Sequence, residues 1–220
     1  MNELTTVQTI AAAALPLLLA ITLHEAAHGW SAHRLGDNTA YMLGRVTINP
    51  LKHIDPLGTI IAPIAIYILS GFSFAFGWAK PVPVNFSRLR NIRRDTALVA
   101  FAGPASNLLM LLAWALVAKI VLMTAGADYF VNSFIGAMTK FGILINSILA
   151  ALNLLPLLPL DGGRILNSWL PAKLSQAYEK IEPYGLFIIL GLLFTGILSP
   201  LLYAMMNIIN TAVFTLIGLN

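Results

Sequence analysis

The 220-residue chain is 58% hydrophobic and only 10% charged, whereas soluble domains carry about a quarter charged residues. This composition excludes an ordinary soluble protein and predicts several membrane-spanning helices. The net charge of +4 forms no basic tract, so the expected partner is the lipid bilayer and not nucleic acid. Cysteine is absent, which excludes thiolate metal sites and leaves His, Asp and Glu as the possible metal ligands.

Six apolar segments follow one another along the chain, and most approach the roughly 20 residues that a spanning helix needs. They run from Val7 to Ala32, Leu57 to Phe76, Thr96 to Met123, Val131 to Leu158, Tyr184 to Leu198 and Leu201 to Leu219. The last two are separated by Ser199-Pro200 and predict a tight helical hairpin. We therefore expect an all-α polytopic membrane protein that forms a single domain over residues 1–220. It should have about five spanning helices, one re-entrant segment and a small extended or β element.

The first segment carries the motif His24-Glu25-Ala26-Ala27-His28. On a helix, His24 and His28 lie one turn apart on one face, so both imidazoles can hold one metal ion while Glu25 polarises a bound water. Three ionisable groups within one turn of an apolar helix are costly and usually functional. The alternative is a pair of interfacial histidines and a glutamate that closes a helix. The motif predicts a zinc-dependent protease that works inside a membrane.

Two stretches after the first segment are predicted to be extended. In residues 40–49, Val46 and Ile48 alternate with polar residues, and in residues 78–85 alternating prolines forbid a helix. A protease needs its scissile bond extended, so an edge strand here could pair with an unwound substrate. The alternative, which the sequence favours equally, is a structural hairpin that covers the site.

The second chemical motif lies far downstream. Pro156 and Pro159 cannot continue a helix, and the pair Gly162-Gly163 allows backbone geometry that other residues avoid, so the helix from Val131 should unwind near Asp161. A carboxylate at such a position needs a cation, and catalytic zinc normally takes three protein ligands, of which the histidines supply two. The alternative is a helix-ending turn whose aspartate caps the next helix.

Taken together, these motifs resemble the site-2 protease family of intramembrane zinc metalloproteases. The resemblance covers roughly residues 15–170. It rests on the motif at 24–28, on the asparagine, proline-rich run and Leu-Asp-Gly at 153–162, and on Gly-Pro-Ala-Ser-Asn at 103–107. These 220 residues leave no room for the PDZ or CBS domains of many relatives, and they include an additional apolar segment at 57–76.

The resemblance implies roles for individual residues. His24, His28 and Asp161 would hold one Zn²⁺ per chain. Glu25 would be the general base, and Asn153 would stabilise the oxyanion.

The predicted metal site restricts the topology. His28 and Asp161 both lie near the carboxyl ends of their spans, so these spans must run parallel to reach one metal. Residues 57–76 should therefore enter the membrane and leave on the same side, with breaks at Pro63 and near Gly71.

Charge counting supports the same topology, because it places eleven basic residues on one face and leaves only Lys119 at the edge of the other. If residues 57–76 crossed the membrane, eight basic residues would lie on one face and four on the other. The positive-inside rule then predicts an outside amino terminus, an inside carboxyl terminus and a metal site near the cytoplasmic side of the cell membrane. The eleven residues are Arg34, Arg45, Lys52, Lys80, Arg88, Arg90, Arg93, Arg94, Arg164, Lys173 and Lys180.

The predicted function is that of a zinc metalloendopeptidase. It would hydrolyse peptide bonds in or near transmembrane segments of membrane proteins, as in regulated intramembrane proteolysis. The alternative is a zinc-binding membrane transporter or a catalytically inactive scaffold. A transporter is expected to show two related halves with paired discontinuous helices, and the sequence shows no such repeat.

Overall fold

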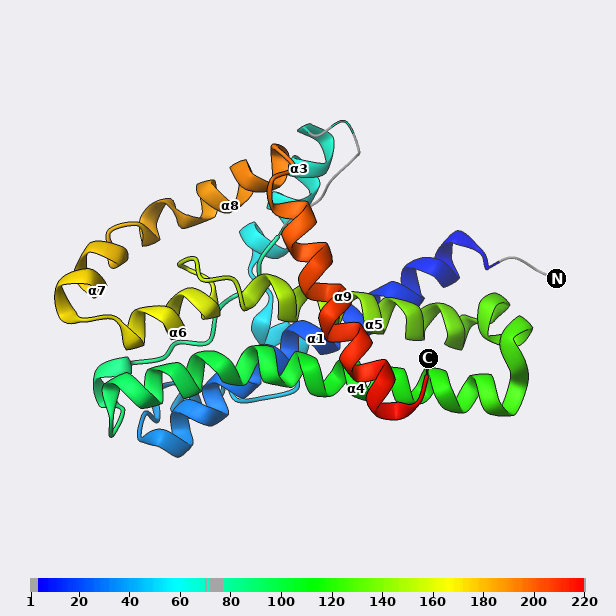
Figure 1. Cartoon of the computed structure of the whole chain (residues 1–220), viewed down its shortest axis with the longest axis horizontal. Coiled ribbons are helices and arrows are strands. Elements are labelled where there is room, and N and C mark those ends of the chain that lie inside the picture. Colours follow the sequence, from blue (N-terminus) through cyan, green and yellow to red (C-terminus); the bar gives the residue numbers. More distant parts are fainter. Residues whose placement is uncertain (1–3, 70, 72–76, 220) are drawn as a thin grey trace.

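The computed structural model describes residues 4–69, 71 and 77–219, and these residues form helices and no strand (Figure 1). The elements are α1 (Thr6–Leu35), α2 (Thr39–Met42), η1 (Pro50–His53), η2 (Pro56–Ile61), α3 (Ala62–Leu69), η3 (Phe86–Arg88), α4 (Ile92–Asn132), α5 (Phe134–Asn153), α6 (Asp161–Trp169), α7 (Ala172–Glu179), η4 (Glu182–Tyr184), α8 (Gly185–Phe194) and α9 (Leu198–Ile217).

Four helices in the described residues, α1, α4, α5 and α9, are long and apolar enough to cross a membrane. They confirm the all-α polytopic fold class, with four candidate spans in the described residues where about five were expected. The expected fifth span contains only α8, whose ten residues cover about 15 Å. It ends before Gly196, which has a left-handed φ of 73°. The predicted break at Ser199-Pro200 is therefore wrong. Both residues lie in the first turn of α9, where a proline is tolerated because the N–H groups of that turn have no helical carbonyl to bond to.

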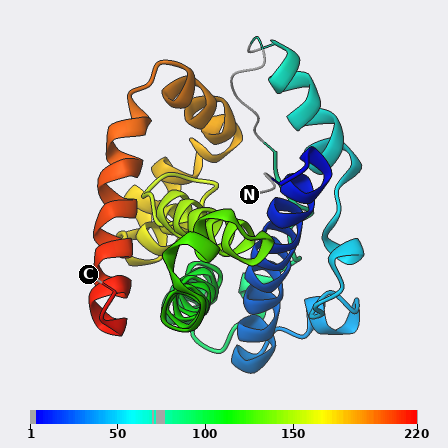
Figure 2. The same ribbon diagram turned by 90° about the vertical axis from the view of Figure 1, so that its right-hand side faces the viewer.

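The helices α1, α4 and α5 form the frame of the molecule. The helices α4 and α5 are antiparallel neighbours, seen end-on in Figure 2, and α1 packs against both, while α9 lies across them. Buried small residues such as Ala20, Ala115 and Ala150 line the helix contacts. Without a hydrophobic driving force in lipid, such close backbone approach is what stabilises helix association.

The two ends of the frame differ in charge. The start of α4, together with α6 and α7, lies at one end, and the amino-terminal part of α1 and the turn between α4 and α5 lie at the other (Figure 1). The first end carries basic residues that the charge count placed on the cytoplasmic face, including Arg93, Arg164 and Lys173.

The predicted re-entrant segment begins as one helical stretch formed by η2 and α3, without the break expected at Pro63. It spans about 21 Å, less than the roughly 30 Å of a bilayer core. Its two ends lie side by side, since the N–H of Trp78 donates to the carbonyl of Gly58 (3.0 Å). A segment that leaves on the side where it entered requires this geometry. Much of the turn expected near Gly71 falls on residues 70 and 72–76, outside the described residues.

The small β element is not seen in the described residues. Residues 40–49 contain the short helix α2, and residues 77–85 are extended without a strand partner. Pro81 and Pro83 have no N–H to donate to a ladder, and the N–H groups of Lys80, Val82 and Asn85 bond to a loop carbonyl and to carboxylates instead. Local contacts thus replace sheet pairing.

Candidate metal centre and active site

Three side chains from two elements meet at one point between α1 and α6. His24 Nε2 lies 3.1 Å from His28 Nε2 and 3.2 Å from Asp161 Oδ2, and His28 Nε2 lies 3.4 Å from Asp161 Oδ1. Ligand atoms of the three residues lie within 4.8 Å of one another, and among the described residues they are the group that could hold a metal ion. Since the group joins the later part of α1 to the chain after α5, the two spans run parallel.

Partners on α4 determine which ring nitrogen of each histidine carries the proton. His28 Nδ1 lies 2.7 Å from the carbonyl oxygen of Val99, which can only accept, so Nδ1 is the donor. His24 Nδ1 lies 2.6 Å from Asn107 Oδ1. The amide of Asn107 is oriented by its Nδ2, which donates to the carbonyl oxygen of Ala20 (3.3 Å), so Oδ1 accepts from His24. Such contacts to the second nitrogen orient histidine ligands in metal sites.

This protonation pattern leaves three electron-rich groups facing one another. The Nε2 lone pairs of His24 and His28 point together, and Asp161 brings a carboxylate. Although Asp161 Oδ2 is buried 3.2 Å from His24 Nε2, it makes no hydrogen bond. Converging lone pairs and a buried carboxylate repel one another unless a cation lies among them. Two imidazoles and a carboxylate are the donor set of a catalytic zinc site, so the residues fit that ion.

Gly103 allows α4 to approach the cluster. A Cβ at this position would lie 2.4 Å from His28 Nε2 and 2.6 Å from His24 Nε2. No real Cβ makes such contacts, so only glycine fits here. The small-residue motif at 103–107 therefore has two structural tasks, since Gly103 leaves room for the ligands and Asn107 orients one of them.

The backbone unwinds before Asp161, as predicted. The helix α5 ends at Asn153, residues 154–160 are irregular, and Asp161 is the first residue of α6. The N-cap of α6 is Leu160 and not Asp161, whose carboxylate faces the histidines. Gly162 and Gly163 are needed for a reason that the sequence did not reveal. Neither has a positive φ, but a Cβ on either would lie 2.4 Å from backbone atoms of residues 154–158.

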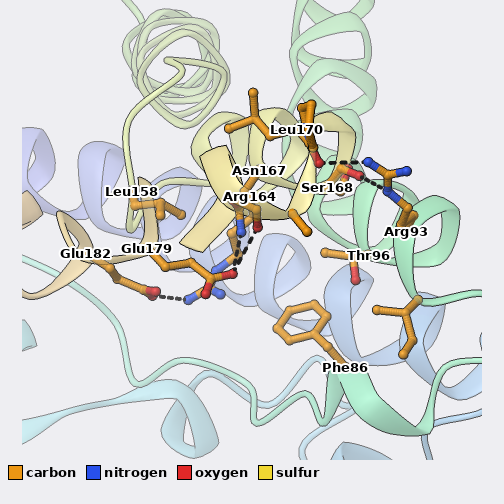
Figure 3. A pocket seen from close by; sticks show the side chains of 14 residues that line it. Phe86, Arg93, Thr96, Leu158, Arg164, Asn167, Ser168, Leu170, Glu179 and Glu182 are labelled. Carbon is orange, nitrogen blue, oxygen red and sulfur yellow. Dashed lines mark hydrogen bonds and ion pairs between the residues drawn. The ribbon is translucent and has the colours of Figure 1, made fainter. Parts of the chain in front are cut away.

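Polar contacts around a cavity of about 600 Å³ hold α6 in place (Figure 3). The Arg93 guanidinium donates to the carbonyl oxygen of Leu170 (2.7 Å), Arg164 pairs with Glu182 (2.7 Å), and Asn167 donates to Glu179 (2.8 Å). These bonds tie α6 to α4 and to the chain around α7 and η4. The cavity is lined by none of the cluster residues, so we assign it a structural role in orienting the helix that begins with Asp161.

Glu25 lies one residue after His24, and a backbone donor holds its carboxylate. The N–H of Val82, in the extended residues 78–85, donates to Glu25 Oε2 at 2.7 Å. The sequence predicted an extended segment near the site but not this contact, because no local pattern relates residue 25 to residue 82.

Asn153 is not part of the cluster in this structure. It is the last residue of α5, and its amide donates back to the carbonyl oxygen of Leu149 (3.0 Å). A second asparagine, Asn107, combines a contact to the cluster with a contact in the helix packing. Asn107 contacts His24 and also donates to Asn146 Oδ1 on α5 (3.0 Å).

Comparison with known proteins shows the family. The chain is 38% identical to a Bacillus subtilis (strain 168) protein named "Putative zinc metalloprotease YwhC", over 87% of this chain and 84% of that protein. The sequence model of the family described as "Peptidase family M50" matches residues 115–196, which include Asn153 and Asp161 but not the two histidines. The chain belongs to this family.

Two further relatives carry the name "Putative zinc metalloprotease Rip2". The protein from Mycolicibacterium smegmatis is 31% identical over 83% of this chain and 66% of its own length. The protein from Mycobacterium tuberculosis (strain H37Rv) is 26% identical over 80% of this chain and 63% of its own length. No solved structure matches the chain.

Membership in family M50 confirms the resemblance to the site-2 proteases. The chain is a multi-pass membrane protein of a zinc peptidase family, and Zn²⁺ is its cofactor. The cluster of His24, His28 and Asp161 is the group in the described residues that could bind this ion.

Proposed function

We propose that this protein is an intramembrane zinc endopeptidase that cuts membrane proteins in or near their transmembrane segments, as in regulated intramembrane proteolysis. The observation that carries the proposal is that Asp161 meets His24 and His28 beside Glu25, on a helix apolar enough to span a bilayer. Residues 1–220 act as one membrane-embedded domain, and one Zn²⁺ binds per chain.

The reaction uses the cluster and the residue beside it. A zinc ion held by His24, His28 and Asp161 would supply a polarised water as the attacking group. Glu25 takes a proton from this water and passes it to the leaving amine of the cut peptide bond. Because Oε2 of Glu25 accepts the N–H of Val82, its other carboxylate oxygen is available for this proton.

Asn153 is the proposed donor to the carbonyl oxygen of the scissile bond, which becomes negative as water adds. In the structure its amide is bonded to the carbonyl oxygen of Leu149 on its own helix. That bond uses one of the two N–H groups of the amide, so the other is the proposed donor to the substrate.

The proposed orientation places the amino terminus outside and the cluster near the cytoplasmic face of the cell membrane, where water can reach it. Its support is the charge asymmetry between the two ends of the frame. Single cysteines introduced into this cysteine-free chain at positions 90 and 173 should label from the cytoplasm, and one at position 128 from outside. Labelling of positions 90 and 173 from opposite sides would refute this orientation.

The function is tested by measuring zinc content and cleavage of a panel of single-span substrates in liposomes on the same samples. Glu25→Gln should retain zinc and lose cleavage by about a hundredfold or more, because it keeps the shape of the side chain and removes the base. His24→Ala should lose both. Cleavage by Glu25→Gln at the wild-type rate would exclude the proposed mechanism and favour a zinc-binding scaffold or transporter.

A further inference from the structure

Glu25 is held from outside its own helix, and the residues that hold its partner identify a further functional side chain. The partner is the N–H of Val82, which donates to Glu25 Oε2 at 2.7 Å. The Val82 side chain is only 7% exposed and packs over Gly29, one turn after Glu25 on α1, where a Cβ would lie 3.0 Å from Val82 Cγ1. Both the side chain and the N–H of Val82 thus face α1.

One guanidinium holds the two residues that precede Val82. Arg45 Nη2 donates to the carbonyl oxygen of Lys80 (2.9 Å) and to that of Pro81 (3.4 Å). The next residue, Val46, also packs over Gly29, where a Cβ would lie 2.9 Å from Val46 Cγ2. Arg45 is therefore anchored to α1 through its neighbour and reaches across to the extended segment.

Few other hydrogen bonds hold the segment near Val82. Pro81 and Pro83 have no N–H, so residues 80–84 contain only three backbone N–H groups. Lys80 donates to the carbonyl oxygen of His53 (2.9 Å), and Val82 donates to Glu25. No sheet ladder fixes the register of the segment, so the two carbonyl contacts of Arg45 set the direction in which the following N–H points.

We propose that Arg45 is a positioning residue for the general base. It fixes the peptide units of Lys80 and Pro81, so that the N–H of Val82 holds one oxygen of Glu25 and leaves the other oriented for proton transfer. This inference rests on the proposed function of Glu25. A displacement of about 1 Å in a reacting group can cost up to about a hundredfold in rate, so loss of the clamp should act on kcat.

The test compares Arg45→Met, Arg45→Lys and the control Lys52→Met. Lys52 is an exposed basic residue of the same region, in η1. Arg45→Met should lower kcat about ten- to a hundredfold, with KM within about twofold and full zinc content. Arg45→Lys should be intermediate, because an ammonium keeps one carbonyl contact but not the planar fork. Lys52→Met should match the wild type.

Hydrogen exchange provides a readout that does not need activity. A peptide that covers residues 80–84 contains only three exchangeable backbone amides, one of which is that of Val82. Arg45→Met should increase the rate of exchange at this amide, because the N–H of Val82 is then held less firmly against Glu25. In a Glu25→Asp background, whose shorter carboxylate no longer reaches Val82, Arg45→Met should change kcat by less than about twofold.

Three results would overturn the proposal. The first is an unchanged kcat in folded Arg45→Met, and the second is a raised KM at constant kcat, which would mean that the segment holds substrate and not Glu25. The third is loss of zinc in both Arg45 variants, which would make Arg45 structural. If Arg45→Met does not fold, the test rests on Arg45→Lys, and a wild-type kcat in that variant would refute the positioning role of Arg45. A failure of the proposed protease function gives a different result, because Glu25→Gln would then cleave at the wild-type rate.

Discussion

The two histidines of the candidate metal site and the proposed general base, Glu25, lie on the same turn of α1, but different parts of the molecule hold them. His24 and His28 are fixed by Asn107 and Val99 of α4, inside the packed helix frame. Glu25 is fixed by Val82, in an extended segment outside that frame. Disturbing the frame should therefore remove metal and activity together, whereas disturbing the segment should affect catalysis or stability and leave the metal bound.

The largest expected effect comes from the frame at its closest approach to the cluster. Gly103→Ala places a Cβ 2.4 Å from His28 Nε2, so α4 must move or the ligands must separate. Zinc content should fall below about a tenth of the wild-type value, and cleavage should drop at least about a hundredfold. Metal analysis and the liposome assay on the same samples measure both.

A matched control is Gly191→Ala in α8, where a Cβ would meet nothing within 4 Å. This variant should behave as the wild type. Full zinc content in Gly103→Ala would show that α4 can move away from the histidines without disturbing the metal site, contrary to this prediction.

A smaller effect is expected from Asn107→Leu, which removes the acceptor from His24 Nδ1 without adding bulk against the ligands. Loss of such an outer contact typically weakens metal affinity by about ten- to a hundredfold. Competition with a chelator measures this affinity, and Asn207→Leu on the exposed face of α9 is the control. Equal zinc affinity in the two variants would exclude Asn107 from the support of His24.

The smallest effect concerns Asp37, which anchors the far end of the extended segment by accepting the N–H of Asn85 (2.7 Å). Burial alone raises the pKa of the Asp37 carboxyl, but hydrogen bonds from the hydroxyl and N–H of Thr39 and from Asn85, with the charge of Arg88 nearby, lower it below its ordinary value. Because the pKa is lower in the folded state, this stabilisation is present above the ordinary carboxyl pKa. It is lost as the pH falls through the folded-state pKa.

Asp37→Asn should therefore lower the Tm in detergent by about 2–6 °C at pH 7, with unchanged zinc content. The difference in Tm between Asp37→Asn and the wild type should shrink as the pH falls below about 4, because the wild-type carboxyl then becomes protonated and its charge no longer stabilises the fold. Thermal unfolding across this pH range measures it, with Asp128→Asn as the control. A Tm difference that grows toward acid pH would show that the sign of the pKa shift is wrong.

Much of the cluster could be predicted from the sequence because its parts obey local rules. The four-residue spacing of His24 and His28 places them on one helix face, and the prolines before Asp161 end a helix wherever it lies. The apolar segments similarly predicted the spans α1, α4, α5 and α9. The error at α8 arose because hydropathy counts apolar residues but does not detect that Gly196 turns the chain.

What the sequence by itself determined is therefore the membrane class, the candidate metal donor set and the place where the backbone must unwind, since each depends on composition or on short-range spacing. The tertiary structure decided which atoms support the chemistry, namely Asn107 and Val99 behind the histidines, the space at Gly103, and Val82 and Arg45 beside Glu25. These partners lie 20 to 83 residues from the side chains that they serve. Only tertiary packing of helices and loops brings them together, because no local periodicity links residues at such separations.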